Sequence, residues 1–163
     1  MEIERKWLIK EFPFMPHYGH YWIKQSYIAV HDDCEARVRW SVPASDNNAK
    51  KVSPFKFTFK TNGGLSRMET EREISQDEYL QYIMMIGKPA IEKDYYTYLV
   101  DNHKIEVSQV DNEWYYAEVE FNNEIEARGY QFPWPELVVE EVTYDDKYKM
   151  KNYWVDTRLN QVK

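Results

Sequence analysis

The chain has one cysteine and five glycines in 163 residues, and this scarcity excludes several classes of protein. A single thiol, Cys34, can form no intramolecular disulfide and no cysteine-rich zinc site. So few glycines are incompatible with a collagen-like or low-complexity chain. A protein that uses cysteine so sparingly fits a reducing compartment, and we expect a cytoplasmic location.

Long apolar runs are also missing. No stretch approaches the roughly 18 consecutive apolar residues that span a bilayer, and no apolar targeting segment precedes the charged start of the chain. Basic residues are outnumbered, with 21 Lys and Arg against 28 Asp and Glu, which leaves a formal charge of −7. This balance argues against a broad surface for nucleic acid. We therefore expect a soluble protein with neither a membrane nor a nucleic acid as partner.

Aromatic residues, in contrast, are plentiful at 17%, including 14 tyrosines, and they favour a sheet. Period-two alternation predicts strands at residues 2–9, 20–30, 34–42, 55–60, 66–74, 90–100, 103–110, 114–121 and 138–142. A loop is expected at 43–53 and a turn at Asn62-Gly63-Gly64. Strands joined by short connections predict one domain over residues 1–163, a mainly β (α+β) antiparallel sheet of about eight strands that can close into a barrel.

Few helices are expected. Ser75 to Glu78 form a capping box, and apolar residues then follow helical spacing until Gly87 ends the helix. We expect this helix to bury its apolar residues, the methionines included, in the core. Further helices are predicted at about 123–128 and 143–158. These amphipathic helices need an apolar surface to cover.

The charged residues are spaced two apart along the strands. Alternation places Glu2, Glu4 and Lys6 on one face of the first strand. The same spacing recurs in Arg37-Val-Arg39, Arg67-Met-Glu69-Thr-Glu71 and Glu118-Val-Glu120. Like charges side by side on a strand repel, so they either face water or hold an ion of opposite sign.

The direction of these charged faces decides the interpretation. If the helices cover the apolar faces on the outside of the barrel, the charges face inward and form a polar tunnel. The cations Lys6, Arg37, Arg39, Lys60, Arg67 and Lys93 would then share a cavity with the acids Glu2, Glu4, Glu118 and Glu120. Such a cavity would suit a polyanion and a hard divalent metal. The alternative is a lipocalin-like barrel or sandwich with solvated charged faces.

The ordered set of motifs closely resembles the CYTH, or triphosphate tunnel metalloenzyme, superfamily. Glu2-x-Glu4-x-Lys6, Arg37-x-Arg39, Lys60, Arg67-x-Glu69-x-Glu71, Lys93 and Glu118-x-Glu120 carry the resemblance, which extends to Glu141-Val142-Thr143 and Tyr148-Lys149. The resemblance implies an eight-stranded antiparallel tunnel, a Mg²⁺ or Mn²⁺ cofactor, and a triphosphate as the small-molecule substrate. It is also compatible with a homodimer.

The resemblance also implies roles for residues. The implied metal ligands are Glu2, Glu4 and Glu120, with Glu118 as an outer or alternate ligand and Glu106 as an additional one. The implied triphosphate-binding residues are Lys6, Arg37, Arg39, Lys60, Arg67 and Lys93. Family members commonly have Lys-x-Arg where this chain has Lys93-Asp94-Tyr95, so one phosphate contact is either missing or supplied elsewhere, by Lys149 or Lys151.

In this interpretation the protein hydrolyses inorganic triphosphate to diphosphate and phosphate, with nucleoside or thiamine triphosphates as other substrates. Glu69 or Glu71 would orient the attacking water. One branch of the family cyclises ATP, but it tends to carry a His-Phe pair before the first motif. A non-catalytic module that binds polyphosphate or nucleotide is the alternative from another class, although four carboxylates would weaken pure anion binding.

Overall fold

The computed structural model describes residues 1–44, 53–61 and 64–160, so Asn62-Gly63 of the predicted turn and most of the predicted loop at 43–53 lie outside the described residues. The strands are β1 (Glu2–Ile9), β2 (Gly19–Val30), β3 (Cys34–Pro43), β4 (Phe55–Thr61), β5 (Ser66–Arg67), β6 (Glu69–Glu73), β7 (Ile91–Val100), β8 (His103–Val110), β9 (Trp114–Glu120) and β10 (Val138–Glu141). The helices are α1 (Gln76–Ile86), α2 (Glu124–Gly129) and α3 (Met150–Trp154), with short turns η1 (Pro135–Leu137), η2 (Asp146–Tyr148) and η3 (Val155–Leu159).

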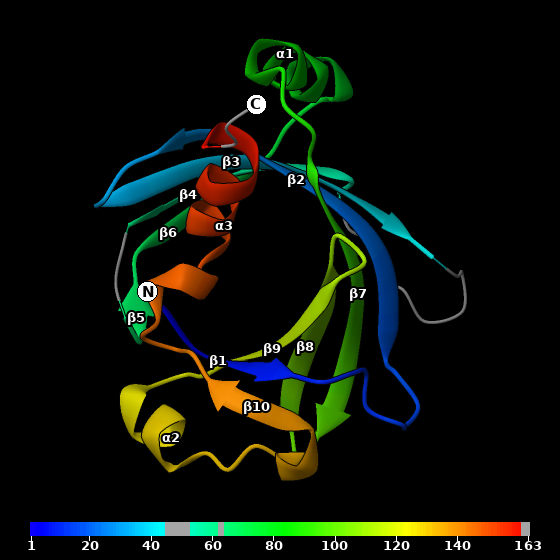
Figure 1. The fold of residues 1–163 in the computed structure, drawn as a ribbon, viewed down its shortest axis with the longest axis vertical. Helices are drawn as coiled ribbons and strands as arrows, with labels where there is room; N and C mark the ends of the chain where they lie inside the picture. The colour runs from blue at the N-terminus through cyan, green and yellow to red at the C-terminus, as the bar shows by residue number, and fades with distance from the viewer. Residues whose placement is uncertain (45–52, 62–63, 161–163) are drawn as a thin grey trace.

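The strands form an antiparallel barrel that is nearly closed (Figure 1). Their order is β10-β1-β9-β8-β7-β2-β3-β4-β6. The circuit returns to its start through β5, which pairs with β1 at Glu2↔Arg67 and leads along the chain into β6. The predicted mainly β fold with an antiparallel barrel is therefore confirmed.

The predicted number of strands is wrong, because the sheet has ten strands rather than eight. The predicted strand at 66–74 is interrupted at Met68, since its first part pairs with β1 and its second part pairs with β4. The strand predicted at 138–142 is present as β10, which pairs with the edge of β1. The split of 66–74 arises from pairing between distant segments, which alternation along the chain does not reveal.

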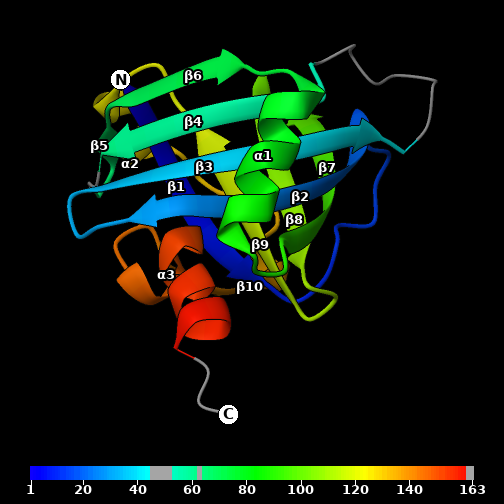
Figure 2. The same ribbon diagram turned by 90° about the horizontal axis from the view of Figure 1, so that it is seen from above.

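Helix α1 covers the outer face of the barrel over β2, β3 and β4, as Figure 2 shows. Its buried Tyr79 packs with Val38 and Ile74, and Trp40 and Phe55 surround them. These apolar residues alternate with the charged ones along the strands, so covering them turns the charged face inward.

The local signals at α1 are confirmed at both ends. The Ser75 side chain accepts a hydrogen bond from the backbone of Glu78, and Gly87 ends the helix with φ of 62°, in the left-handed region. The expectation that its methionines fill the core is wrong, because Met84 is 82% and Met85 74% exposed. The helix turns Tyr79, Tyr82, Ile83 and Ile86 towards the sheet instead.

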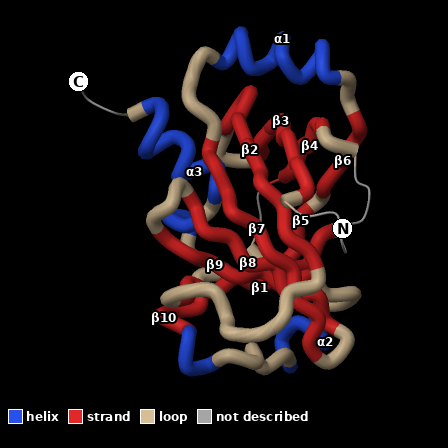
Figure 3. Tube along the Cα trace, turned by 90° about the vertical axis from the view of Figure 1, so that its right-hand side faces the viewer, coloured by secondary structure: helices blue, strands red, loops and turns tan. Residues whose placement is uncertain are grey.

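A second apolar face lies on the outside of β1, β8 and β9. Trp7, Val107 and Val119 are buried there beneath α2 and the chain that follows it. The Trp7 ring stacks on Phe132 with 4.6 Å between centroids. Figure 3 shows α1 and α2 on opposite sides of the strands. The two coverings leave the charged faces directed into the barrel.

The C-terminal segment closes one end of the barrel. Met150 and Trp154 of α3 pack against Tyr27, Ile91 and Tyr116. The helix predicted at 143–158 is thus divided, because η2 precedes α3 and is capped by the Asp145 side chain. Among the described residues, no helix is long and apolar enough to cross a membrane.

Candidate active site

The barrel encloses a cavity of about 410 Å³. Of the residues to which the sequence assigned a role in metal binding, phosphate binding or catalysis, all but Lys151 line it: Glu2, Glu4, Lys6, Arg37, Arg39, Lys60, Arg67, Glu69, Glu71, Lys93, Glu106, Glu118, Glu120 and Lys149. The structure therefore brings this set together, from strands far apart in the sequence. The roles themselves stay predictions.

The register of β1, β8 and β9 gathers the acids. Glu4 lies directly opposite Glu120, and Glu118 lies opposite both Lys6 and Glu106. Like charges facing each other across paired strands repel. A wall of carboxylates in this arrangement therefore favours a bound cation or a proton.

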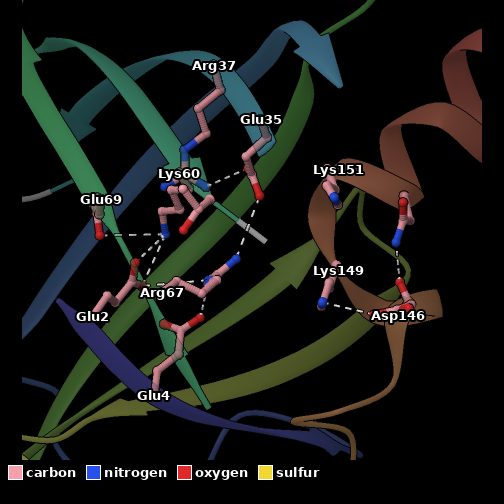
Figure 4. A network of polar contacts seen from close by, with 12 residues as sticks. Glu2, Glu4, Glu35, Arg37, Lys60, Arg67, Glu69, Asp146, Lys149 and Lys151 are labelled. Carbon is pink, nitrogen blue, oxygen red and sulfur yellow. Dashed lines mark hydrogen bonds and ion pairs between the residues drawn. The ribbon is translucent and has the colours of Figure 1, made fainter. Parts of the chain in front are cut away.

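A network of ion pairs joins this wall to the opposite side of the cavity (Figure 4). Lys60 Nζ lies 3.1 Å from both carboxylate oxygens of Glu2, and these side chains are only 8% exposed. Arg67 Nη2 donates to Glu4 Oε1 at 2.5 Å and lies 3.7 Å from Glu2 Oε1. The other Arg67 nitrogen, Nη1, lies 3.6 Å from Glu35. Lys60 and Arg67 are thus neutralised within the protein.

Other cations of the cavity have neutral partners. Lys93 Nζ donates to the Tyr116 hydroxyl at 2.6 Å, and Lys6 Nζ donates to the Tyr148 carbonyl at 2.6 Å. Arg39 Nη2 donates to Gln25 Oε1 at 3.0 Å. The Nε atoms of Arg37 and Arg39 are buried and have no hydrogen-bond partner among the described residues. Buried donors without partners are costly, so these groups are suited to an anionic ligand.

Burial and crowding shift the pKa values of the charged groups. Burial raises the pKa of Glu4, and the charge of Glu2 raises it further. Burial likewise raises the pKa of Glu118, and the charge of Glu4 raises it further. Burial also lowers the pKa of Lys93 well below its ordinary value, helped by the charges of Arg39 and Arg37. The protein has thus gathered ionisable groups into an environment that penalises their charged forms.

The two acids predicted to orient water differ in their surroundings. Burial works against the ionised form of Glu71, but hydrogen bonds from Lys56 and Thr58, each at 3.1 Å, lower its pKa overall. Glu69 lies 3.9 Å from Lys60. Glu71 is therefore held as a carboxylate that can accept a hydrogen bond.

The predicted substitutes for the missing arginine are separated by the structure. Lys149 lines the cavity, with Nζ 2.9 Å from Asp146. Lys151 is 4% exposed and is not part of the lining, because its Nζ donates to the backbone carbonyl of His31 at 2.8 Å. Tyr95, which stands where the arginine was expected, also lines the cavity.

Sequence reasoning missed several residues that face the cavity. Glu35 is buried between Arg67 and Arg37, at 3.6 and 4.0 Å. It stands two residues before Arg37, so the alternation used for the arginines would have found it. Tyr116 stands two residues before Glu118 in the same way, and Tyr27 lies deep in the lining.

The acids suit a divalent metal by their chemistry. Carboxylate oxygens are the ligands that Mg²⁺ and Mn²⁺ prefer. Glu2 Oε2 is buried and, although close to Lys60, accepts no hydrogen bond from the described residues. Within residues 1–44, 53–61 and 64–160, no three His, Cys, Asp or Glu side chains form a ready-made metal cluster. The acids fit a metal by donor chemistry, but in this structure Glu2 and Glu4 are bound to Lys60 and Arg67 and would have to leave these partners to ligate it.

Comparison with known proteins places this site in context. No family model and no curated protein matches the chain. Two crystal structures of a protein named NE1496 are similar to it. One, described as a hypothetical protein, is 27% identical, with 94% of this chain and 97% of that chain covered and a TM-score of 0.59. The other, described as the inorganic triphosphatase NE1496, is 25% identical, with 94% and 93% covered and a TM-score of 0.57.

The resemblance to the CYTH/triphosphate tunnel family is confirmed. The PH1012 protein of Pyrococcus horikoshii OT3 shares the fold at 18% identity, with 78% of this chain and 84% of that chain covered and a TM-score of 0.56. The chain thus has the fold of a triphosphate tunnel protein, and the cavity lies inside that tunnel.

Proposed function

We propose that the protein is a divalent-metal-dependent triphosphatase whose main substrate is inorganic triphosphate. The observation that carries the proposal is the cavity of the barrel, in which cations from several strands face a wall of carboxylates. Support also comes from the likeness to a protein described as an inorganic triphosphatase. Nucleoside and thiamine triphosphates are further substrates to test.

The cations would hold the phosphates in line. Lys6, Arg39 and Lys93 would contact phosphate oxygens, together with Arg37, Lys60, Arg67 and Lys149. Most of the catalysis would then be positioning and electrostatic stabilisation of the charge on the transferred phosphoryl group. Glu2, Glu4 and Glu120 would hold Mg²⁺ or Mn²⁺, with Glu118 and Glu106 beside them. The bound metal would supply neutralisation of phosphate oxygens.

The carboxylates on β6 would act on water. Glu71, which is kept ionised by Lys56 and Thr58, or Glu69 would orient a water molecule towards the terminal phosphorus. A new P–O bond forms to this water, the bridging P–O bond breaks, and the shared electron pair leaves with diphosphate. The products are phosphate, diphosphate and the proton released from water.

Phosphate release tests this proposal. Wild type, Glu4→Gln and Glu92→Gln are incubated with inorganic triphosphate, ATP or thiamine triphosphate in Mg²⁺, Mn²⁺ or EDTA. Glu92 is the control because its side chain is 61% exposed. We expect metal-dependent release from inorganic triphosphate that falls at least 100-fold in Glu4→Gln, as expected for loss of a metal ligand, and is retained in Glu92→Gln.

Other outcomes would contradict the proposal. Formation of cyclic AMP and diphosphate from ATP would identify a cyclase. Tight triphosphate binding without turnover under any metal condition would identify a non-catalytic binding module.

A further inference from the structure

Two groups among the cations that line the tunnel differ in their partners. The first group, the paired cations, consists of Lys60 and Arg67, which are bound to Glu2 and Glu4. The second group, the available cations, consists of Arg39, Lys93 and Lys6, which donate hydrogen bonds to an amide oxygen, a hydroxyl and a carbonyl, respectively. Figure 4 shows that the paired cations belong to one continuous network.

The paired cations are costly to separate from their carboxylates. Glu2 and Lys60 are almost completely buried, and Arg67 is 12% exposed at its side chain. A triphosphate that took Lys60 and Arg67 by itself would leave Glu2 and Glu4 as buried, unpaired charges next to an anion. The available cations carry a smaller penalty, because a phosphate oxygen replaces a neutral hydrogen-bond acceptor, although the charge of Glu118 also attracts Lys6 and Lys93. Arg39 even presents a buried Nε without a partner among the described residues.

We propose, building on the proposed function, that the tunnel binds triphosphate in two stages. The available cations Arg39, Lys93 and Lys6 bind the anion in the absence of metal. Lys60 and Arg67 contact the anion only when a divalent cation has replaced them as the partner of Glu2 and Glu4. The carboxylates and the paired cations then exchange partners together, and no buried charge is left alone.

The exchange has a thermodynamic consequence. Because each ligand removes the penalty that the other would meet, metal and triphosphate strengthen each other's binding by the same factor. The coupling resides in Lys60 and Arg67, so removal of either of them should abolish much of it. The available cations contribute affinity without coupling.

Two variants that each remove one arginine charge distinguish the available cations from the paired cations. Arg39→Gln and Arg67→Gln are titrated calorimetrically with imidotriphosphate, a non-hydrolysable analogue, in EDTA and again in Mg²⁺. In EDTA we expect Arg39→Gln to weaken binding at least tenfold more than Arg67→Gln does. In Mg²⁺ we expect both variants to weaken binding by at least tenfold. Equal losses in EDTA, or no binding by wild type in either condition, would overturn the proposal.

Two carboxylate variants test the same exchange and do not depend on the folding of Arg67→Gln. Glu4→Gln frees Arg67, whereas Glu106→Gln removes an equal charge from a carboxylate that lies 3.2 Å from Lys104. In EDTA, Glu4→Gln should tighten analogue binding at least threefold more than Glu106→Gln. An equal effect would contradict partner exchange.

Manganese binding without any phosphate gives a separate readout. Electron paramagnetic resonance of Mn²⁺ should show at least threefold tighter binding to Arg67→Gln than to Arg39→Gln, and equal affinities would contradict the proposal.

The two proposals can fail separately. Analogue binding with the predicted pattern but without phosphate release would support two-stage binding and contradict the triphosphatase activity. Phosphate release by the wild type, together with equal losses of analogue affinity in EDTA for Arg39→Gln and Arg67→Gln, would support the triphosphatase activity and contradict two-stage binding.

Discussion

At the scale of one residue, Lys93 is a buried charge of the site that destabilises the folded protein. The residue is 5% exposed, and its ammonium group lies among Tyr116, Arg39 and Arg37. Burial and the two arginines lower its pKa well below the ordinary 10.5. Its charge therefore opposes folding, and a bound anion would offset that cost. Functional sites commonly retain such unfavourable groups.

Lys93→Met should stabilise the ligand-free protein and weaken triphosphate binding at least tenfold. Because folding lowers this pKa, the unfolded chain binds the proton more tightly, and wild-type stability rises with pH between the folded pKa and 10.5. The gain in Tm of Lys93→Met over the wild type is therefore largest on the acidic side of that window, and it disappears above pH 10.5. Thermal unfolding in EDTA across this range, with Lys104→Met as the exposed control, measures it. A lower Tm at every pH would contradict the prediction.

At the scale of elements, one carboxylate helps to anchor the segment formed by α3 and η3. Asp111, in the turn between β8 and β9, accepts hydrogen bonds from Arg158 Nη1 at 2.7 Å and from the Tyr153 hydroxyl at 2.6 Å. Arg158 also donates to the carbonyl of Ala90 at 2.8 Å. These bonds hold α3 over the end of the barrel, where Trp154 is buried.

Asp111→Asn should lower the free energy of unfolding by about 1–3 kcal/mol at pH 7, the range for a charged hydrogen bond. Although burial opposes it, hydrogen bonds from Arg158 and Tyr153 lower the pKa of Asp111 overall. The stabilisation that Asp111 provides is thus fully present at pH values above its ordinary pKa of 3.8, and it is lost as the pH falls through the lower pKa of the folded state. Denaturant unfolding at pH 7 and at acidic pH should show the difference shrinking, whereas exposed Asp33→Asn should show none.

At the scale of the whole molecule, the barrel is built around charges that only ligands can fully satisfy. Two apolar clusters, one beneath α1 and one beneath α2, supply the core. The interior holds carboxylates opposite one another and buried arginine nitrogens that have no hydrogen-bond partner within the part of the chain that the structure describes. Ligands that bind the folded chain alone stabilise it by mass action.

Metal and triphosphate together should therefore raise Tm by more than the sum of their separate effects. At about 100 times the dissociation constant, binding contributes about 2.7 kcal/mol, which corresponds to roughly 5–10 °C for a chain of this size. Differential scanning fluorimetry with Mg²⁺, imidotriphosphate and both measures it. Strictly additive shifts would contradict coupled binding.

Some of this organisation was predictable because it depends on near neighbours. Alternation on β1 places Glu2, Glu4 and Lys6 on one face, and the cap at Ser75 with the stop at Gly87 bounds α1. The family motifs are short and local too. These features follow from backbone geometry over a few residues.

Only the tertiary structure decided which cations are paired and which acids face each other. The Glu2–Lys60 and Glu4–Arg67 pairs join β1 to strands about sixty residues away, and Glu35 entered the site through its contact with Arg67. The split between β5 and β6, the position of β10 beside β1 and the exposed Met84 have the same origin. Alternation determines which residues share a face of a strand, but strand pairing and helix packing determine what that face meets.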